Sequence, residues 1–473
     1  MNDITAFFAF LKYCLGYKEN MSRVIAGMNW HELYSFASKQ ALLGLCFEGI
    51  ERLGEEYPEE LKRNPIGREL LMTWMGKAQQ IRRQNMKVNA VASKLFSMLR
   101  EDGMRCCVLK GQGNALMYPN PYSRTPGDVD VWIEASRERI LEYAQKKFEL
   151  GDDIRLQHLE TSLDGVPVEL HFFPCSMNNP IYHARLQKWF RRNADLQCSH
   201  IVGLPDGAGD IAIPTTAFNV VYQLTHLYHH FFDEGIGMRQ IIDYFLVVND
   251  FSKNVFLNND LSNHPVNFSN HPVPLSKEGS TFSPSPSSSG SGDVTAPSRC
   301  SEPLRSKDGG PSKVSPDCAG WDRLDAIGAS KVSPDCAGWD RLAIEGDNSA
   351  TAVTSSASTA LVVVQRELKY LGLWKFAGAV MYVLHKALGL SEEKMIAPMD
   401  EKRGKLLLAE ILNGGNFGRH FTKYGHFTQQ GMAKKYFLKI WRNMHFVRYF
   451  PAEALSEPIF RTWHFFWRLK HRR

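Results

Sequence analysis

The chain has 473 residues, 44% of them hydrophobic and 22% charged, with a formal net charge of +6 at pH 7. This composition is typical of globular proteins, and the length is sufficient for two or three domains that each bury a core. The longest apolar stretch near the C-terminal half, 372–390, contains Lys375, His385 and Lys386, polar groups that are costly in a bilayer. We therefore predict a buried helix there and no membrane span.

The start of the chain and its cysteines both favour the cytoplasm. An acidic residue precedes the first apolar run, which lacks the basic start and the small-residue cleavage site of a secretion signal. The nine cysteines form no CxxC pair, and Cys106 and Cys107 are adjacent within an apolar run, where we expect them to pack as small hydrophobic residues. These features indicate a reducing compartment.

Residues 1–102 are predicted to form an N-terminal helical region. Apolar residues recur at steps of three and four over the segment that begins at Trp30, and the same period continues from Gly67 to Arg100. Such a period gathers the apolar side chains on one face of each helix.

Residues 103–205 show a different pattern and are predicted to form a small α+β core. A short apolar run at its start predicts a strand, a glycine-bearing turn and a brief helix follow, and the alternating VDVWI predicts a second strand. A helix from about Ser136 comes next. Two further alternating segments flank Asp164 and Gly165, a dipeptide suited to a tight hairpin turn, and Pro167 indicates an edge or strand-entry position.

Helical periods return in 206–251 and 361–473, which we predict to form a C-terminal helical region in two segments. The first segment contains His226, His229 and His230, of which the first and the last lie one helical turn apart. Because no HExxH motif accompanies them, we interpret these histidines as cleft-lining or core residues and not as metal ligands.

Residues 252–360 separate the two helical segments and are predicted to be a disordered low-complexity insertion. They are rich in Ser, Pro, Gly and Asn and show no period, so they cannot bury enough apolar surface to offset the chain entropy. Within them SKVSPDCAGWDRL occurs twice, beginning at Ser312 and at Ser330. Two copies are too few to stack a solenoid core, which indicates a tolerated insertion without chemistry.

The segment from Lys434 to Arg473 mixes Lys and Arg with aromatic residues. One interpretation is a surface that binds nucleic acid or an anionic membrane. The other is an amphipathic helix whose aromatic side chains face a core and whose charges face water. We favour the amphipathic helix.

The most informative motif is the acid pair Asp128 and Asp130. Side chains alternate along a strand, so both carboxylates are expected to project from one face about 7 Å apart. The opposite face, which carries Val129, Val131 and Ile133, is expected to pack on a core. Two carboxylates so close repel each other unless a divalent cation neutralises both. Mg²⁺, with Mn²⁺ as an alternative, is the predicted ion, because it prefers oxygen ligands and is usually held by carboxylates together with substrate phosphates.

Upstream of the acid pair, Lys110, Gly111 and Gly113 lie between a strand and a helix. Backbone N–H groups in such a turn, together with a lysine ammonium, are suited to bind a triphosphate. Arg124 is expected to add positive charge against the phosphates. These four residues are the predicted substrate-binding residues of the turn and its surroundings.

A third carboxylate is expected from a neighbouring strand. Glu169 is the nearby acid that is flanked by apolar residues in a strand pattern, and it is predicted to be a metal ligand or a general base. His171 on the same face is predicted to be either a substrate contact or a capping residue.

Each of these motifs has a structural alternative. An Asp-x-Asp pair alone is common at strand starts and surface turns, and a Lys-Gly dipeptide after a strand is less specific still. Glu169 alone is also compatible with an exposed strand residue paired with Lys or Arg. The functional interpretation depends on the combination of these motifs in one order along the chain.

In this order the motifs resemble the DNA polymerase beta-type nucleotidyltransferase superfamily. They resemble more closely a bacterial nucleotidyltransferase family with Lys-Gly in the turn, an arginine before the acid pair and an acid-Leu-His strand. The resemblance extends to a helical lead-in and a later helix pair, and spans nearly everything except the insertion. A departure is Gln112, where the superfamily often has a serine. The residues that carry the resemblance are Lys110, Gly111, Arg124, Asp128, Asp130, Glu169, Leu170, His171, Trp30, His226, His230, Arg239 and Asp243.

The resemblance implies an α+β fold in which a small mixed sheet, with 103–205 as catalytic core, lies between N-terminal and C-terminal helical regions. It implies a Mg²⁺-dependent transferase that moves a nucleoside monophosphate from a nucleoside triphosphate to a hydroxyl of an unidentified acceptor: a protein, a small molecule or an RNA end. Asp128, Asp130 and Glu169 are the catalytic and metal-binding residues by this resemblance. The alternatives are a catalytically silent nucleotide-binding regulatory module and a helical interaction protein.

Overall fold

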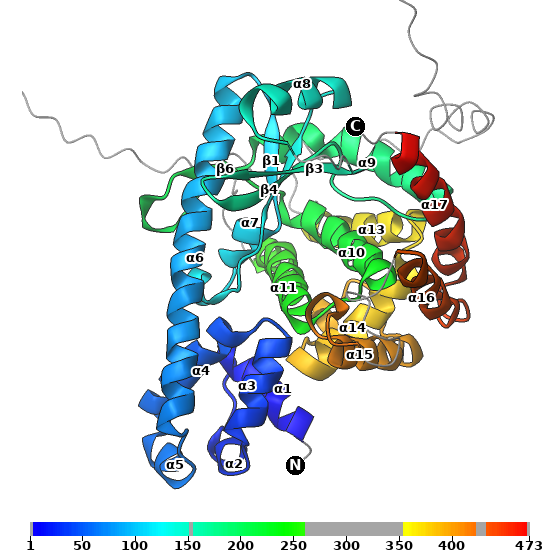
Figure 1. The fold of residues 1–473 in the computed structure, drawn as a ribbon. Coiled ribbons are helices and arrows are strands. Elements are labelled where there is room, and N and C mark those ends of the chain that lie inside the picture. Colours follow the sequence, from blue (N-terminus) through cyan, green and yellow to red (C-terminus); the bar gives the residue numbers. More distant parts are fainter. Residues whose placement is uncertain (1–2, 151–154, 261–352, 422–431, 471–473) are drawn as a thin grey trace, which may run out of the picture. The chain divides into compact units, whose positions relative to one another are not determined.

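The N-terminal part of the chain is helical, as its apolar period predicts (Figure 1). The computed structural model describes residues 3–150, 155–260, 353–421 and 432–470. The first helices pack on one another, and the long α6 continues from them to the strands, where it contacts β1, β4 and β6. The bounds are α1 Asp3–Cys14, α2 Ser22–Ala26, α3 Trp30–Lys39, α4 Leu43–Glu56, α5 Pro58–Arg63 and α6 Arg68–Glu101.

Four strands form a mixed sheet in the order β1-β2-β4-β3. β1 is antiparallel to β2, β2 is parallel to β4, and β3 is antiparallel to β4. The short β5 and β6 form a separate antiparallel pair. The α+β class with a small mixed sheet and helical flanks is therefore confirmed. The bounds are β1 Cys106–Leu109, β2 Val129–Ile133, β3 His158–Leu163, β4 Val166–His171, β5 Ile201–Gly203 and β6 Asp210–Ala212.

The turn between β3 and β4 has the geometry that its Asp-Gly dipeptide predicts. Asp164 and Gly165 both have positive φ, +50° and +71°, a combination that matches the twist of the flanking strands. Pro167 occupies a strand-entry position, because β2 pairs with β4 only from Val168 onward. The alternative prediction of an edge strand is wrong, since β4 lies between β2 and β3.

The two faces of the sheet contact different cores. Val129, Val131 and Ile133 belong to a cluster formed with α6 and α8, as the alternation predicts. Trp132, from the opposite face, belongs to the larger cluster that includes α9 and α10. Asp130 shares the face of Trp132, so strand alternation directs its carboxylate toward these helices.

Several helices that follow begin at a short polar side chain. Ser136 accepts a hydrogen bond from a backbone N–H in the first turn of α8, and Asn179 accepts two in the first turn of α9. These side chains satisfy donors that have no partner within the helix. The helix bounds are α7 Gly111–Ala115, α8 Arg137–Lys147, α9 Pro180–Ser199, α10 Thr216–Asp233, α11 Met238–Asp260, α13 Val353–Tyr370, α14 Trp374–Leu388, α15 Glu401–Gly414, α16 Met432–Met444 and α17 Pro451–Lys470, with short 3₁₀ turns η1 Pro121–Ser123, η2 Pro205–Gly207, η4 Glu392–Lys394 and η5 Asn416–Gly418.

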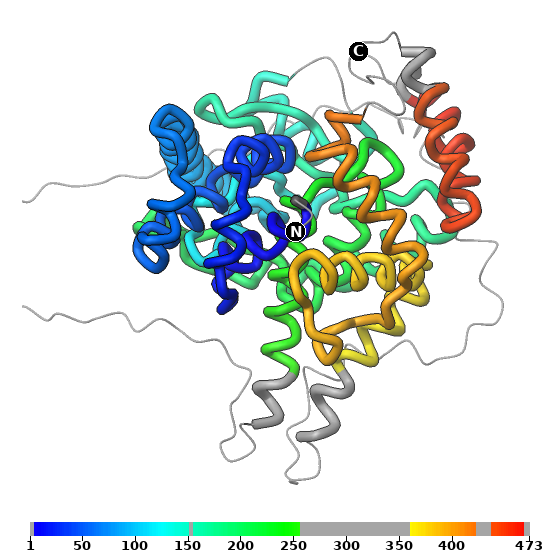
Figure 2. The backbone as a smooth tube through the Cα atoms, turned by 90° about the horizontal axis from the view of Figure 1, so that it is seen from below, coloured from blue at the N-terminus to red at the C-terminus, as the bar shows by residue number. Residues whose placement is uncertain are grey.

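Helices α11 and α13 lie side by side although a long segment separates them in the sequence (Figure 2). Both extend into 252–360, the segment predicted to lack structure, because α11 continues to Asp260 and α13 begins at Val353. Residues 261–352, with both copies of the repeat, lie outside the described residues. The two helical segments on either side of them therefore pack together as one set of helices.

The apolar stretch 372–390 contains α14, which is a buried helix as predicted. Among the described helices, none combines the length and the apolar character that a bilayer crossing requires. Cys106 and Cys107 are buried and form no disulfide, in keeping with their predicted role as small hydrophobic side chains.

The C-terminal helices α16 and α17 follow the predicted amphipathic pattern only in part. Phe446 and Phe450, which lie between the two helices, are buried in the core, as expected. However, Phe437 and Ile459 are exposed, whereas the charged Arg442 is buried and donates to a backbone carbonyl at the end of α10 at 2.8 Å. The prediction that charges face water is wrong for Arg442, because a guanidinium can be buried when backbone oxygens accept its hydrogen bonds.

Candidate functional site

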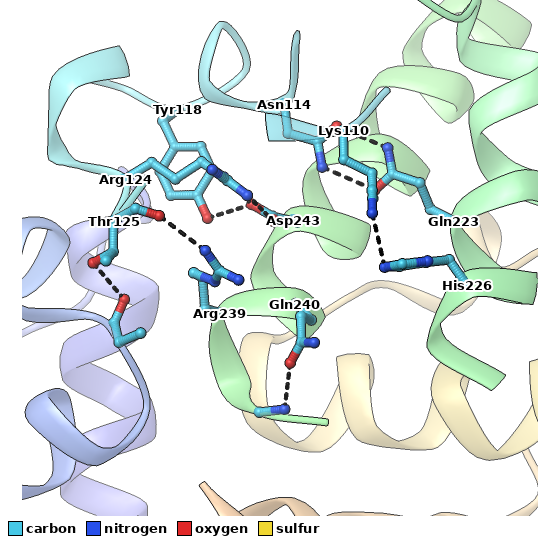
Figure 3. A network of polar contacts seen from close by, with 12 residues as sticks. Lys110, Asn114, Tyr118, Arg124, Thr125, Gln223, His226, Arg239, Gln240 and Asp243 are labelled. Carbon is cyan, nitrogen blue, oxygen red and sulfur yellow. Dashed lines mark hydrogen bonds and ion pairs between the residues drawn. The ribbon is translucent and has the colours of Figure 1, made fainter. Parts of the chain in front are cut away.

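The turn after β1 holds Lys110 in a conformation that side-chain-bearing residues rarely adopt. Lys110 has φ +51° and ψ −130°, and Gly111 follows with φ +39°. Its Nζ donates to His226 Nε2 at 3.1 Å (Figure 3). The same Nζ lies 3.3 Å from Asp130 Oδ1. Backbone strain of this kind costs about 1–3 kcal/mol and is concentrated at functional sites. Lys110 thereby joins the sheet to α10.

The structure brings Asp130 and Glu169 together. In the register of the parallel strands β2 and β4, Asp130 lies opposite Glu169. The Nε2 of His171 is 3.0 Å from Asp130 Oδ1 and 3.2 Å from Glu169 Oε2, so one imidazole contacts both carboxylates. Asp128 precedes β2 and is exposed. The arrangement presents three acids from two neighbouring strands at one end of the sheet.

The three acids influence each other's ionisation. The negative charge of Asp130, with that of Glu169, raises the pKa of Asp128 to about 6. Burial opposes ionisation of Asp130 and Glu169, but Lys110 and His171 lower the pKa of Asp130, and His171 lowers that of Glu169. The three carboxylates therefore share only two nearby cations, and a bound divalent ion would neutralise the remaining negative charge.

His171 lies among the acids and away from solvent. It is 1% exposed, and although burial disfavours its charged form, the hydrogen bonds to Asp130 and Glu169 raise its pKa to about 9. The predicted roles, substrate contact or capping, stay predictions, and the structure adds the two contacts with the acids. The side chain orients the two carboxylates, and this is the role we assign to it.

A pocket opens beside the acids, between the Lys110 turn and the helices α10 and α11. Gly113 does not line it: a Cβ at this position would lie 3.0 Å from Ile213, so this glycine is explained by packing and not by phosphate contact. Glu169 and His171 also lie outside the lining. The pocket is lined by Lys110, Gly111, Asn114, Arg124, Gly127, Asp128, Asp130, Gln223, His226, Leu227, Arg239, Gln240, Asp243 and Phe417.

Arg124 is held in a buried ion pair on the helical side of the pocket (Figure 3). Its Nε and Nη2 donate to the two carboxylate oxygens of Asp243 at 2.9 and 2.8 Å. Tyr118 donates to the same carboxylate at 2.8 Å. The guanidinium of Arg124, which was predicted to face phosphates, forms an ion pair with Asp243. This pair connects the loop before β2 to α11.

The histidines of α10 line the cleft or the core, as predicted. His226 lines the pocket, and its ring centroid lies 4.3 Å from that of His230. Burial lowers the pKa of both and of His229, so they are neutral at neutral pH. In the part of the chain that the structure describes, none of them joins a potential metal-binding group.

His158 is a neighbour of the acids that the sequence analysis missed. It lies in β3 opposite His171, and its Nδ1 is 3.3 Å from Glu169 Oε2. One ligand atom each of His158, Glu169 and His171 lie within 4.8 Å of one another, a possible metal-binding group. Imidazole ligands suit Zn²⁺ and other transition metals, whereas Asp128 and Asp130 with Glu169 offer the oxygen set that Mg²⁺ prefers. In the sequence, His158 and Glu160 alternate along β3, and this pattern could have indicated that His158 lies near the acids.

Arg239 and Asp243 were noted in the sequence only as part of the resemblance. They lie one turn apart near the start of α11, and both side chains are buried. A buried acid and base at a spacing of four in an otherwise apolar helix is the signal that would have marked them.

Comparisons with known proteins identify a family for this chain. Residues 26–262, half of the chain, match the family described as uncharacterised nucleotidyltransferase. A similar solved structure is that of an antigenic nucleotidyltransferase-like protein from Paracoccidioides brasiliensis, with 16% identity and a TM-score of 0.23 over 37% of this chain and 86% of that chain. No curated protein matches the chain. The matched segment contains the whole four-stranded sheet and the pocket lining up to Asp243.

Proposed function

Because the chain belongs to the family of uncharacterised nucleotidyltransferases, we propose that it transfers a nucleoside monophosphate from a nucleoside triphosphate to a hydroxyl of an acceptor. The observation that carries the proposal is the position of the acids. Asp130 and Glu169 meet across neighbouring parallel strands, Asp128 is exposed beside them, and Lys110 lies 3.3 Å from Asp130 at the edge of a pocket. Acids beside a cationic pocket are what phosphoryl transfer requires.

The carboxylates support a divalent cation with oxygen ligands by their chemistry, although among the described residues the side chains whose ligand atoms lie within 4.8 Å of one another are His158, Glu169 and His171. Asp128, Asp130 and Glu169 present carboxylates, and the raised pKa of Asp128 reflects negative charge that no protein cation fully neutralises. These three residues would hold Mg²⁺, or Mn²⁺ in its place. When bound, the ion would stabilise the charge of the phosphates and favour deprotonation of the attacking hydroxyl.

The remaining steps are assigned to side chains of the chain. A bond forms between the acceptor oxygen and the α-phosphorus, and the bond from the α-phosphorus to the bridging oxygen breaks, which releases pyrophosphate. The ammonium of Lys110 offsets the negative charge of the triphosphate. The hydroxyl proton passes to a carboxylate oxygen, for which Asp128 is the exposed acid of the three.

The proposal is tested with the full chain, wild type and Asp128→Asn. Thermal unfolding is followed with ATP, CTP, GTP and UTP, each with and without Mg²⁺, and transfer is followed with α-labelled nucleotide. We expect Mg²⁺-dependent stabilisation by at least one nucleotide. Transfer should fall by about 100-fold or more in Asp128→Asn, since the interaction removed is worth several kcal/mol at the transition state.

A matched control is Asp164→Asn, in the exposed hairpin turn, where asparagine also accepts positive φ. It should transfer at the wild-type rate. Nucleotide binding without transfer in the wild type would replace the proposal with a silent binding module. Absence of any Mg²⁺-dependent binding would reject both.

A further inference from the structure

Arg239 is a buried cation in the pocket that lacks an ionic partner of its own. It is 8% exposed and lies in the first turn of α11. Its Nη1 donates to the backbone oxygen of Thr125 at 3.0 Å, and its Nε has no hydrogen-bond acceptor (Figure 3). Within the described ranges no carboxylate forms an ion pair with it. A buried charge without a partner is unfavourable, so this guanidinium is a candidate ligand-binding group.

The carboxylate of Asp243, whose charge acts on Arg239, is hydrogen-bonded to another arginine. Asp243 accepts from both Nε and Nη2 of Arg124, which leaves two guanidinium groups and one matched carboxylate on this side of the pocket. Burial, and next the positive charge of Arg124, lower the pKa of Arg239. An anionic ligand in the pocket would supply the missing negative charge.

The orientation of Arg239 leaves one edge of its guanidinium for such a ligand. Thr125 occupies Nη1, so the edge formed by Nε and Nη2 carries no hydrogen bond to the described residues. The ring of Phe417, whose φ is +54°, lies 5.5 Å from Cζ of Arg239 and restricts the plane of the guanidinium. A planar fork of this kind matches two oxygens of a phosphate.

Arg239 and Lys110 lie at different parts of the same pocket lining. Lys110 contacts Asp130, whereas the charge of Asp128 is among those that act on Arg239. Both cations line the pocket that Asp128 and Asp130 also line, so a single phosphate-bearing ligand in it can contact them together with a metal ion on the acids.

We propose that Arg239 binds the triphosphate moiety of the nucleotide substrate through its Nε and Nη2 edge, with Lys110 as the second cationic contact. The inference rests on the proposed function and adds a substrate-binding residue to it. Arg124, in contrast, keeps a positioning role through Asp243.

The chain contains a matched control for this arginine. Arg185 in α9 also donates through Nη1 to a backbone oxygen, that of Tyr370 at 2.8 Å. Its Cζ lies 4.6 Å over the ring of the same tyrosine, and it does not line the pocket. Arg185→Gln therefore removes the same two kinds of contact without touching the site.

The test compares wild type, Arg239→Gln, Arg239→Lys and Arg185→Gln as full chains. Titration calorimetry with sodium tripolyphosphate and Mg²⁺ measures anion affinity, and transfer assays with α-labelled nucleotide measure kcat and KM. For Arg239→Gln we expect tripolyphosphate affinity to fall about 10- to 100-fold, with a matching rise in KM. Arg239→Lys should lie between it and the wild type, because lysine keeps the charge without the fork. Arg185→Gln should equal the wild type.

Wild-type tripolyphosphate affinity and KM in folded Arg239→Gln would overturn the inference. If that variant does not fold, Arg239→Lys decides, since it retains a donor for Thr125: unchanged affinity overturns the inference, and a loss of about 10-fold supports it. The proposed function fails separately. If the wild type binds tripolyphosphate through Arg239 but transfers no nucleotide, the inference is supported and the transferase proposal fails. If nucleotide is transferred and the KM of Arg239→Gln is unchanged, the transferase proposal is supported and the inference fails.

Discussion

The strand side and the helix side of the pocket each contain a buried aspartate, but the two are partnered very differently. On the helix side, Asp243 accepts two hydrogen bonds from Arg124 and one from Tyr118. On the strand side, Asp130 shares Lys110 and His171 with further acids of the site. Asp243 accepts three hydrogen bonds and has an arginine of its own. Asp130 belongs to a group in which three carboxylates share two cations.

This difference separates a residue that holds the fold from residues available for a ligand. Loss of either partner of a buried ion pair is strongly destabilising, because the remaining charge would stay buried alone. In the acid group, Lys110 and His171 favour the charges of Asp130 and Glu169, but the same charges oppose ionisation of Asp128. The contrast can be tested on each side in turn.

The largest effect on stability is expected for Asp243→Asn. Without its partner, the guanidinium of Arg124 remains buried and unpaired, and the free energy of unfolding should fall by about 3–5 kcal/mol. Asp130→Asn should cost less, because the two cations it leaves behind keep other acids as neighbours: Lys110 also acts on Asp128, and His171 keeps its contact with Glu169. Urea unfolding of the two variants measures the difference, and equal losses would show that the two aspartates play the same structural role.

A smaller effect is expected at the strained turn of the strand side. Lys110→Gly should raise the free energy of unfolding relative to Lys110→Ala by about 2 kcal/mol, since glycine adopts positive φ without strain. Both variants lose the ammonium, so both should bind Mg²⁺ with tripolyphosphate at least about 10-fold more weakly than the wild type. A glycine variant no more stable than the alanine variant would mean that the turn stores no strain.

The smallest effect is expected on the pH dependence of stability, where His171 in the acid group differs from His183 in α9. The acids keep His171 protonated, whereas burial lowers the pKa of His183 in α9 from 6.5 to about 4. The neutral form of His183 is favoured by the fold, so its contribution is complete above pH 6.5 and is lost as the pH falls toward 4. Between pH 6.5 and 5.5 this amounts to about 1 kcal/mol. His183→Phe should show a correspondingly shallower decline in unfolding free energy over that range, and an unchanged slope would contradict it.

Local pattern was sufficient to find the four strands of the mixed sheet, but not the short β5 and β6, and it placed Asp128 in a strand that begins one residue later. Alternation along VDVWI places Val129 and Val131 in one core and Asp130 on the other face, as the structure has it. The Asp-Gly turn and the apolar helix 374–388 followed from equally short stretches of sequence. Burial of the charged Arg442 did not follow, because its acceptor is a backbone oxygen on a distant helix.

The sequence by itself determined the periodicity of the elements and the face on which each acid lies, because a strand or helix repeats over two to four residues. Only the tertiary structure decided which groups meet across long separations. Asp243 pairs with Arg124 from 119 positions away, and His226 meets Lys110 from 116 away. These contacts depend on how α10 and α11 pack against the sheet, and no local pattern records that packing. The same packing pairs Arg124 with Asp243 and places both Arg124 and Arg239 in the pocket lining.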